Sequence, residues 1–77
     1  MALDTIIQTI AQTIHVDADG ITAETELSSL GIDSLKAINI LFELEEIFKV
    51  EIPNEVIAEL KTVSDIENIL NQLLGDQ

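Results

Sequence analysis

The 77-residue chain contains no cysteine, tryptophan or tyrosine, and it has a single histidine. Without cysteine it can form neither disulfide bonds nor thiolate zinc sites, and it has no nucleophilic thiol of its own. The scarcity of histidine and of aromatic rings leaves few side chains for acid–base catalysis or for stacking. We therefore expect no catalytic residue and no metal ligand.

Long hydrophobic stretches are also missing, although 47% of the residues are apolar. Isoleucine and leucine are spread along the whole chain, so the sequence predicts a packed core and no membrane-spanning segment. Residues 1–4 lack the basic and apolar regions of a secretory signal. We expect a free-standing cytoplasmic chain that folds as one domain over residues 1–77.

Basic residues are scarce, since three lysines oppose fifteen carboxylates and the net charge is −12. Such a surface repels phosphate backbones and anionic lipids, so nucleic acids and membranes are not expected partners. It attracts basic protein surfaces over long distances and speeds encounter with them. Composition alone fits a role of the charge in solubility better than a role in recognition.

The spacing of the apolar residues predicts an all-α four-helix bundle with three longer helices, a short third helix and a long first loop. The predicted segments are a first helix over Asp4–His15, a connection over Val16–Ile32, a second helix over Asp33–Phe48, a short helix from Pro53 or Asn54 to Leu60, and a last helix from Thr62 to Gly75. So long a connection in a small domain is expected to be functional or to be packed by its own apolar residues. Those available are Ile21, Leu27, Leu30 and Ile32.

Local signals mark the ends of these helices. Asp33 is a good N-cap because its carboxylate can accept hydrogen bonds from the free amides of the first turn. The sequence Thr62-Val63-Ser64-Asp65 is typical of a capping box, with aspartate in place of the usual glutamate. Pro53 disfavours helix at the residue before it and so separates the second and third helices. His15 is expected at a helix end, where a protonated imidazole is favourable near the last carbonyls.

Ser34 stands at the start of the second predicted helix, in the sequence Gly31-Ile32-Asp33-Ser34-Leu35. The unpaired amides and the dipole of a helix start favour a phosphate at this position. The negative charge of Asp33 partly opposes one. By themselves, these five residues fit an ordinary capped helix start better than a site.

A wider pattern changes that interpretation. Four blocks resemble the sequences of acyl carrier proteins: Leu30-Gly31-Ile32-Asp33-Ser34-Leu35, Leu44-Glu45-Glu46-Ile47-Phe48, Ile52-Pro53-Asn54-Glu55 and Thr62-Val63-Ser64-Asp65. Their order and spacing, together with the helix pattern, the acidity and the length, extend the resemblance over essentially all 77 residues. The first block is similar to the prosthetic-group attachment motif of that family.

The resemblance implies that Ser34 receives 4′-phosphopantetheine from coenzyme A, transferred by a separate phosphopantetheinyl transferase. Asp33 would support the transfer by helping to position a magnesium ion in the transferase complex. The arm would supply the thiol that the chain lacks and hold an acyl group as a thioester. The protein would then be a monomeric carrier and not an enzyme, and its partners would be acyl-transferring and synthase enzymes with basic docking surfaces.

The second predicted helix carries more apolar residues than one buried face needs. At roughly 100° per residue, a core face collects Ala37, Ile40, Leu41, Leu44, Ile47 and Phe48, and the adjacent sector collects Leu35, Ile38, Phe42 and Glu45. We expect partner enzymes to bind an exposed docking face made of Leu35, Ile38, Asn39, Phe42, Glu45 and Glu46. The alternative is that Ile38 and Phe42 fill the bundle. Lys36 and Asn39 stand where fatty-acid carriers usually have acidic residues, which indicates either a specialised pathway or ordinary sequence drift.

The cargo and one rival function stay open at this point. A fatty acyl or polyketide chain is the favoured cargo, and an aminoacyl or peptidyl group is the alternative. A different class of answer is an unmodified acidic adaptor or a calcium-binding protein. Asp17, Asp19, Gly20 and Glu26 fall at EF-hand positions, but His15 stands where the first ligand, an aspartate, is required.

Overall fold

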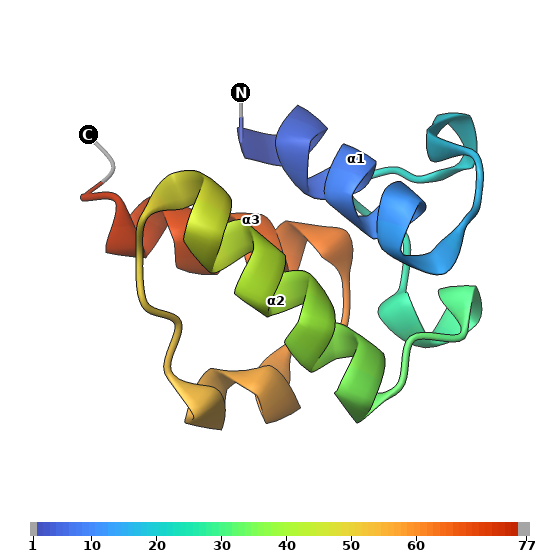
Figure 1. Ribbon diagram of the computed structural model, residues 1–77. Helices are drawn as coiled ribbons and strands as arrows, with labels where there is room; N and C mark the ends of the chain where they lie inside the picture. The colour runs from blue at the N-terminus through green and yellow to red at the C-terminus, as the bar shows by residue number, and fades with distance from the viewer. Residues whose placement is uncertain (1, 76–77) are drawn as a thin grey trace.

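The computed structural model describes residues 2–75 and contains three α-helices and three short 3₁₀ helices (Figure 1). In chain order these are α1 (Ala2–Ile14), η1 (Ala18–Gly20), η2 (Leu27–Leu30), α2 (Ser34–Phe48), η3 (Asn54–Glu59) and α3 (Val63–Leu73). Within residues 2–75, β-type pairing is limited to one isolated antiparallel bridge between Glu26 and Thr62. The predicted all-helical fold is confirmed, and its short third helix is a 3₁₀ helix.

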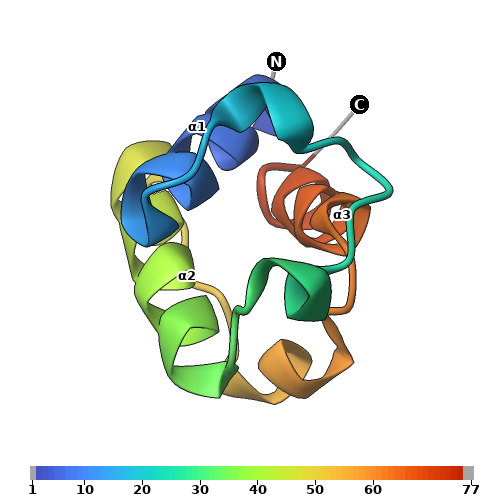
Figure 2. The same ribbon diagram turned by 90° about the vertical axis from the view of Figure 1, so that its right-hand side faces the viewer.

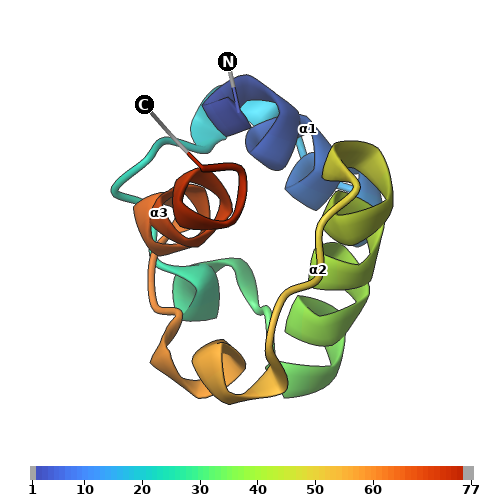
Figure 3. The same ribbon diagram turned by 90° about the vertical axis from the view of Figure 1, so that its left-hand side faces the viewer.

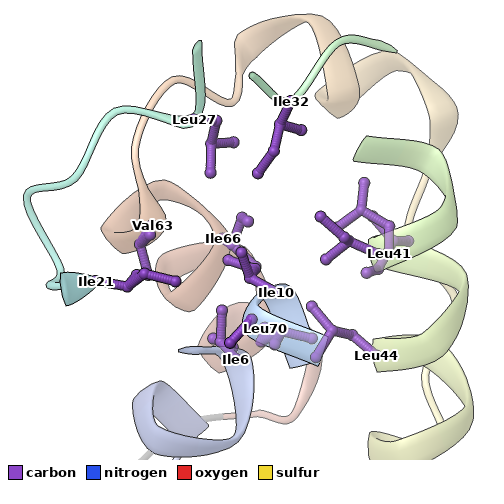
Figure 4. Packing of buried hydrophobic residues seen from close by; sticks show 13 residues of the cluster. Ile6, Ile10, Ile21, Leu27, Ile32, Leu41, Leu44, Val63, Ile66 and Leu70 are labelled. Atoms are coloured by element: carbon purple, nitrogen blue, oxygen red, sulfur yellow. The ribbon is translucent and has the colours of Figure 1, made fainter. Parts of the chain in front are cut away.

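The elements enclose a core of aliphatic side chains. α1 packs against both α2 and α3, and η3 packs against α2. Figures 2 and 3 show this arrangement from two opposite sides, with η3 beside the first turns of α2 in both views. The buried hydrophobic residues point into the middle (Figure 4) and are Ile6, Ile10, Ala11, Ile21, Leu27, Ile32, Ile40, Leu41, Leu44, Ile52, Val63, Ile66 and Leu70.

Two helices end on a residue with left-handed backbone. His15 follows α1 with a φ of 62°, and Lys49 follows α2 with a φ of 59°. The next amide, of Val16 or Val50, donates to the carbonyl five residues earlier, as in a Schellman motif. His15 therefore lies just beyond α1, whereas the sequence placed it as the last helical residue.

The connection between α1 and α2 is bound to the start of α3. The amide of Val63 donates to the carbonyl of Thr25 at 3.1 Å, and the amide of Ser64 donates to the carbonyl of Ala23 at 2.9 Å. Amides in the first turn of a helix have no partner within the helix. The connection therefore supplies acceptors that α3 cannot provide for itself.

Apolar residues of the same connection pack into the core, as predicted. Ile21, Leu27 and Ile32 are buried, and Leu30 is partly buried against them. The amide of Leu27 also donates to the carbonyl of Lys61 at 2.8 Å. The long first loop thus has a fixed path across the bundle.

The predicted core face of α2 is correct except at one residue. Ile40, Leu41 and Leu44 are buried, with Ala37 and Phe48 partly buried beside them. Ile47 is 48% exposed, so its assignment to the core was wrong. On a regular helix Ile47 lies roughly 60° to one side of Leu44, at the edge of the buried arc, where the side chain reaches solvent.

The predicted capping box is present at the start of α3. Oδ2 of Asp65 accepts from the amide of Lys61 at 2.8 Å and from the amide of Thr62 at 3.0 Å. In return, the amide of Asp65 donates to Oγ1 of Thr62 at 3.3 Å. The hydrogen bond from the Lys61 backbone is the largest of the interactions that lower the pKa of Asp65.

We expect Asp65→Asn to reduce the free energy of unfolding by about 1 kcal/mol at neutral pH. The folded-state pKa of Asp65 is below its ordinary value of 3.8, so the charged carboxylate stabilises the folded state. This stabilisation is fully present above the unfolded pKa and is lost as the pH falls through the folded pKa. Urea denaturation at neutral pH and at a series of pH values on the acid side of the ordinary pKa measures it.

Glu55→Gln is the matched control, because it removes the same charge from an exposed position on η3. Its free energy of unfolding should stay close to that of the unsubstituted chain. The deficit of Asp65→Asn should shrink toward the acid end of the series. A deficit that is constant across the series would contradict a role for the charge.

Candidate functional site

Ser34 is the first residue of α2, and Asp33 caps the helix. The Asp33 backbone is extended, with a φ of −90° and a ψ of −174°. Its Oδ1 accepts from the amide of Lys36 at 2.9 Å, and its carbonyl accepts from the amide of Ala37 at 2.9 Å. The helix start predicted from the sequence is confirmed, with Asp33 as the cap and not as a helical residue.

The turn before the cap aims the chain into α2. Gly31 has a φ of 76°, and its amide donates to the carbonyl of Ser28 at 3.0 Å. The amide of Ile32 donates back to the carbonyl of Leu27 at 3.1 Å, which closes η2. A Cβ on Gly31 would meet no atom within 4 Å, so only the left-handed backbone favours glycine here.

Ser34 is exposed and lies between two shallow hollows that share the η3 residues Ile57 and Ala58. One hollow runs toward the core and is completed by Leu27, Ile32, Asp33, Ala37 and Leu60. The other runs outward along α2 and is completed by Ile38, Phe42 and Asn54. Within residues 2–75, the Ser34 hydroxyl has no hydrogen-bond partner.

Most residues of the predicted docking face are exposed. Leu35 is 67% exposed and Phe42 is 57% exposed, and Asn39 and Glu46 are also on the surface. Ile38 is half-buried. The alternative that Phe42 fills the bundle is therefore wrong, while Ile38 contributes to both the surface and the packing.

Glu45 departs from the expected exposure. Its side chain is half-buried, and its Oε2 accepts from the amide of Ile52 at 2.6 Å. It also lines a surface hollow with Phe42, Glu46, Lys49, Val50 and Glu51. The predicted face is therefore exposed at Leu35, Asn39, Phe42 and Glu46, whereas Glu45 is half-buried and hydrogen-bonded to the backbone of Ile52.

Sequence reasoning missed the contribution of η3 to the site. Asn54, Ile57 and Ala58 line the hollows beside Ser34, yet none was predicted as a site residue. The break at Pro53 indicated that a short helix follows, which was the available signal. The side of this helix that meets α2 depends on tertiary packing, which no local pattern encodes.

The region of the EF-hand comparison is organised by local turns. Oδ1 of Asp17 accepts from the amide of Asp19 at 3.1 Å, which caps η1. No group of three or more histidine, aspartate or glutamate side chains between residues 2 and 75 is arranged to hold a metal ion. In the same part of the chain, no helix has the length and apolar character needed to cross a membrane.

Comparisons with known proteins point to one class. The family model for a phosphopantetheine attachment site matches residues 4–70. The acyl carrier protein of Phytoplasma mali is 34% identical over 73 residues, which cover 94% of this chain and 87% of that protein. The acyl carrier protein of Syntrophobacter fumaroxidans is 41% identical over 66 residues, which cover 84% and 82%.

Two further matches agree with these. A non-reducing polyketide synthase of Zymoseptoria tritici is 39% identical over 61 residues, which are 79% of this chain and 3% of the synthase. The crystal structure of an acyl carrier protein from Thermotoga maritima is similar in fold, with a TM-score of 0.86. That match has 21% identity and covers 97% of this chain and 88% of the other.

The fold and the matched attachment-site model define a phosphopantetheine-dependent carrier protein. Within that class, the chain belongs to the acyl carrier protein family. It therefore bears a covalently attached 4′-phosphopantetheine group, as the resemblance implied. Membership of this family also implies interaction with transferase and synthase enzymes.

We expect Asp33→Ala to lower the free energy of unfolding by about 1 kcal/mol, because the amide of Lys36 loses its acceptor. Asp33→Ser should recover most of this loss, since a serine hydroxyl also caps well. Urea denaturation of the three proteins measures the difference. Equal stability of the Ala and Ser variants would contradict the capping role.

Proposed function

We propose that Ser34 is the residue to which 4′-phosphopantetheine is attached. The observation that carries this proposal is an exposed hydroxyl on the first residue of a capped helix. Within residues 2–75 this hydroxyl has no hydrogen-bond partner, and a hollow lies on each side of it. The hydroxyls of two other serines are engaged: Oγ of Ser29 donates to the carbonyl of Glu26, and Oγ of Ser64 lies 3.0 Å from Oγ1 of Thr62.

The surroundings of Ser34 suit a phosphodiester. The amides and the dipole of the first turn of α2 favour negative charge there, and the exposed position leaves the phosphate in water. Asp33 adds an opposing charge, but its carboxylate is turned to the Lys36 amide. When bound, the group supplies the thiol on which acyl cargo is carried, and the chain itself has no cysteine.

We propose that this protein carries cargo and does not itself catalyse a reaction. Few of its side chains suit acid–base or nucleophilic chemistry, so its partner enzymes would make and break the bonds. Fatty acyl or polyketide chains are the proposed cargo, supported by one relative named as an acyl carrier protein and another named as a polyketide synthase. An aminoacyl group remains the alternative.

The proposed partner surface is the docking face together with the outward hollow that Ser34 lines with Ile38 and Phe42. It combines exposed apolar side chains, Leu35 and Phe42, with the carboxylate of Glu46. A basic partner surface would complement it, and the net charge of −12 would speed their encounter. The same charge keeps like chains apart, which supports a monomer.

We also propose that the chain forms a single domain and is located in the cytoplasm. Asp33 would support the transfer of the phosphopantetheine group to Ser34 by the transferase.

Incubation with coenzyme A and a broad-specificity phosphopantetheinyl transferase should add the mass of one phosphopantetheine group to the chain. Intact-mass spectrometry measures the gain. Ser34→Ala should show none, because the acceptor hydroxyl is gone. Ser28→Ala, which removes an exposed hydroxyl nearby on η2, should be modified like the unsubstituted chain.

Two results would overturn the attachment proposal. One is no mass gain in the unsubstituted chain, which would mean that Ser34 does not accept the group. The other is an equal gain in Ser34→Ala, which would place the group elsewhere. Mass analysis of the protein purified from its native cells would then identify the cargo.

Charge reversal on the docking face should weaken transferase binding. We expect Glu46→Lys to raise the Kd by about three- to tenfold at low salt, because an exposed attraction becomes a repulsion. The effect should shrink at high salt, where exposed charges are screened. Glu24→Lys makes the same charge change at an exposed position of the first loop and is the control. Equal effects of the two substitutions would indicate dependence on net charge and not on this face.

A further inference from the structure

Glu45 accepts hydrogen bonds from three backbone amides that follow α2. Its carbonyl accepts from Lys49 and, at 3.2 Å, from Val50. Its carboxylate reaches further along the chain and accepts from Ile52 at 2.6 Å. The first two bonds end the helix in an ordinary way. The third is a side-chain contact and therefore depends on the identity of this residue.

The Ile52 amide is the last hydrogen-bonded amide before η3. Pro53 follows it and η3 begins at Asn54. Ile52 itself is 7% exposed, so its side chain anchors the connection to the core. By contrast, η3 has no side-chain cap at its start and no fully buried residue, and its Val56 and Ile57 are only partly buried against the core. Its position therefore depends on the segments that enter and leave it as well as on this partial packing.

The position of η3 matters because η3 faces Ser34. Ile57 and Ala58 line both hollows beside that serine. Figure 3 shows the connection after α2 descending to η3, which lies next to the start of α2. A shift of the connection would move Ile57 and Ala58 relative to Ser34 and would change both hollows together.

We infer that Glu45 is a positioning residue that holds η3 opposite Ser34 through the Ile52 amide. It sets the shape of the surface that the transferase meets around the serine. The part of this inference that concerns Ser34 rests on the proposed attachment there. The part that concerns η3 is independent of it.

Glu46 provides a matched comparison within the same helix. It carries the same charge and lines the same surface hollow as Glu45. It is exposed, and its carboxylate has no hydrogen-bond partner in residues 2–75. Substitution of both residues in parallel therefore separates positioning from the general attraction of a basic partner.

Hydrogen exchange measured residue by residue tests the positioning role in the unmodified protein. In Glu45→Ala, the Ile52 amide should exchange about tenfold faster, since a hydrogen bond to a charged acceptor is lost. The amides of Val56 and Leu60, whose hydrogen bonds to Pro53 and Ile57 close the first and last turns of η3, should also exchange faster. Glu46→Ala should leave all of these rates unchanged. Glu45→Gln should stay near the original rates, because its amide oxygen can accept the same bond.

The inference fails if Glu45→Gln exchanges as fast as Glu45→Ala, or if amides throughout α1 and α3 accelerate equally. The second result would indicate a global loss of stability and not a local one.

Kinetics of the transferase give a second readout. The kcat/KM for modification of Ser34 should fall more in Glu45→Ala than in Glu46→Ala and should recover in Glu45→Gln. Equal losses in Glu45→Gln and Glu46→Gln, with no recovery, would assign Glu45 a purely electrostatic role. If the unsubstituted chain is not modified at all, the attachment proposal fails, and the exchange experiment still decides whether Glu45 positions η3.

Discussion

The position of Ser34 depends on the hydrogen bonds between the first turn of α3 and the connection that leads to Ser34. The Val63 and Ser64 amides are bonded to carbonyls of the connection between α1 and α2, at Thr25 and Ala23. Residues 16–32 form a long connection, and the entropy of closing a loop depends only weakly on its length. Loop closure alone therefore does not select one path for this connection. These bonds, and the burial of Ile21, Leu27 and Ile32, select one path. That path ends at Gly31, where the chain turns into the Asp33 cap and presents Ser34.

Charge sets the second constraint on this molecule. Fifteen carboxylates and three lysines in 77 residues repel one another across a small surface. The carboxylates are unevenly placed, since α1 carries Asp4 alone, whereas residues 43–59 carry Glu43, Glu45, Glu46, Glu51, Glu55 and Glu59. Residues 17–33 carry five more carboxylates, so the acidic part of the chain extends from the first loop to η3. The docking face lies within this part, but the carboxylates are not confined to it.

Most of the fold follows from local patterns in the sequence. The Asp33 cap and the Thr62–Asp65 capping box were both predictable, because each depends on residues within four positions. The buried residues of α2 followed from helical periodicity, and the error at Ile47 arose at the edge of the buried arc, where the periodicity is least decisive. The contribution of η3 was not predictable, because Ile57 and Ala58 line the hollows beside Ser34 only as a result of the packing of η3 on α2.

Glu45 shows why the site was harder to predict than the fold. Its helical angle places it between the core face and the exposed face, so periodicity alone assigns it to a partner surface. The structure gives its carboxylate a backbone partner seven residues away, at Ile52. Such a bond leaves no repeating pattern in a single sequence. One physical argument does point to such a bond. A carboxylate in a largely apolar arc loses hydration when it is partly buried, so it needs a hydrogen-bond partner there.

The two sides of the site differ in how firmly they are held. Ser34 belongs to a helix that is capped by Asp33 and packed through Ile40, Leu41 and Leu44. The opposite side is a short 3₁₀ helix without a fully buried residue, in which Val56 and Ile57 are partly buried against the core. Segments with fewer buried contacts open at lower free-energy cost. A firmly held Ser34, the proposed attachment point, beside a less firmly held η3 would suit a carrier protein that interacts with transferase and synthase enzymes. The proposed role of Glu45 lies at this boundary, because its hydrogen bond to the Ile52 amide joins α2 to the segment that leads into η3.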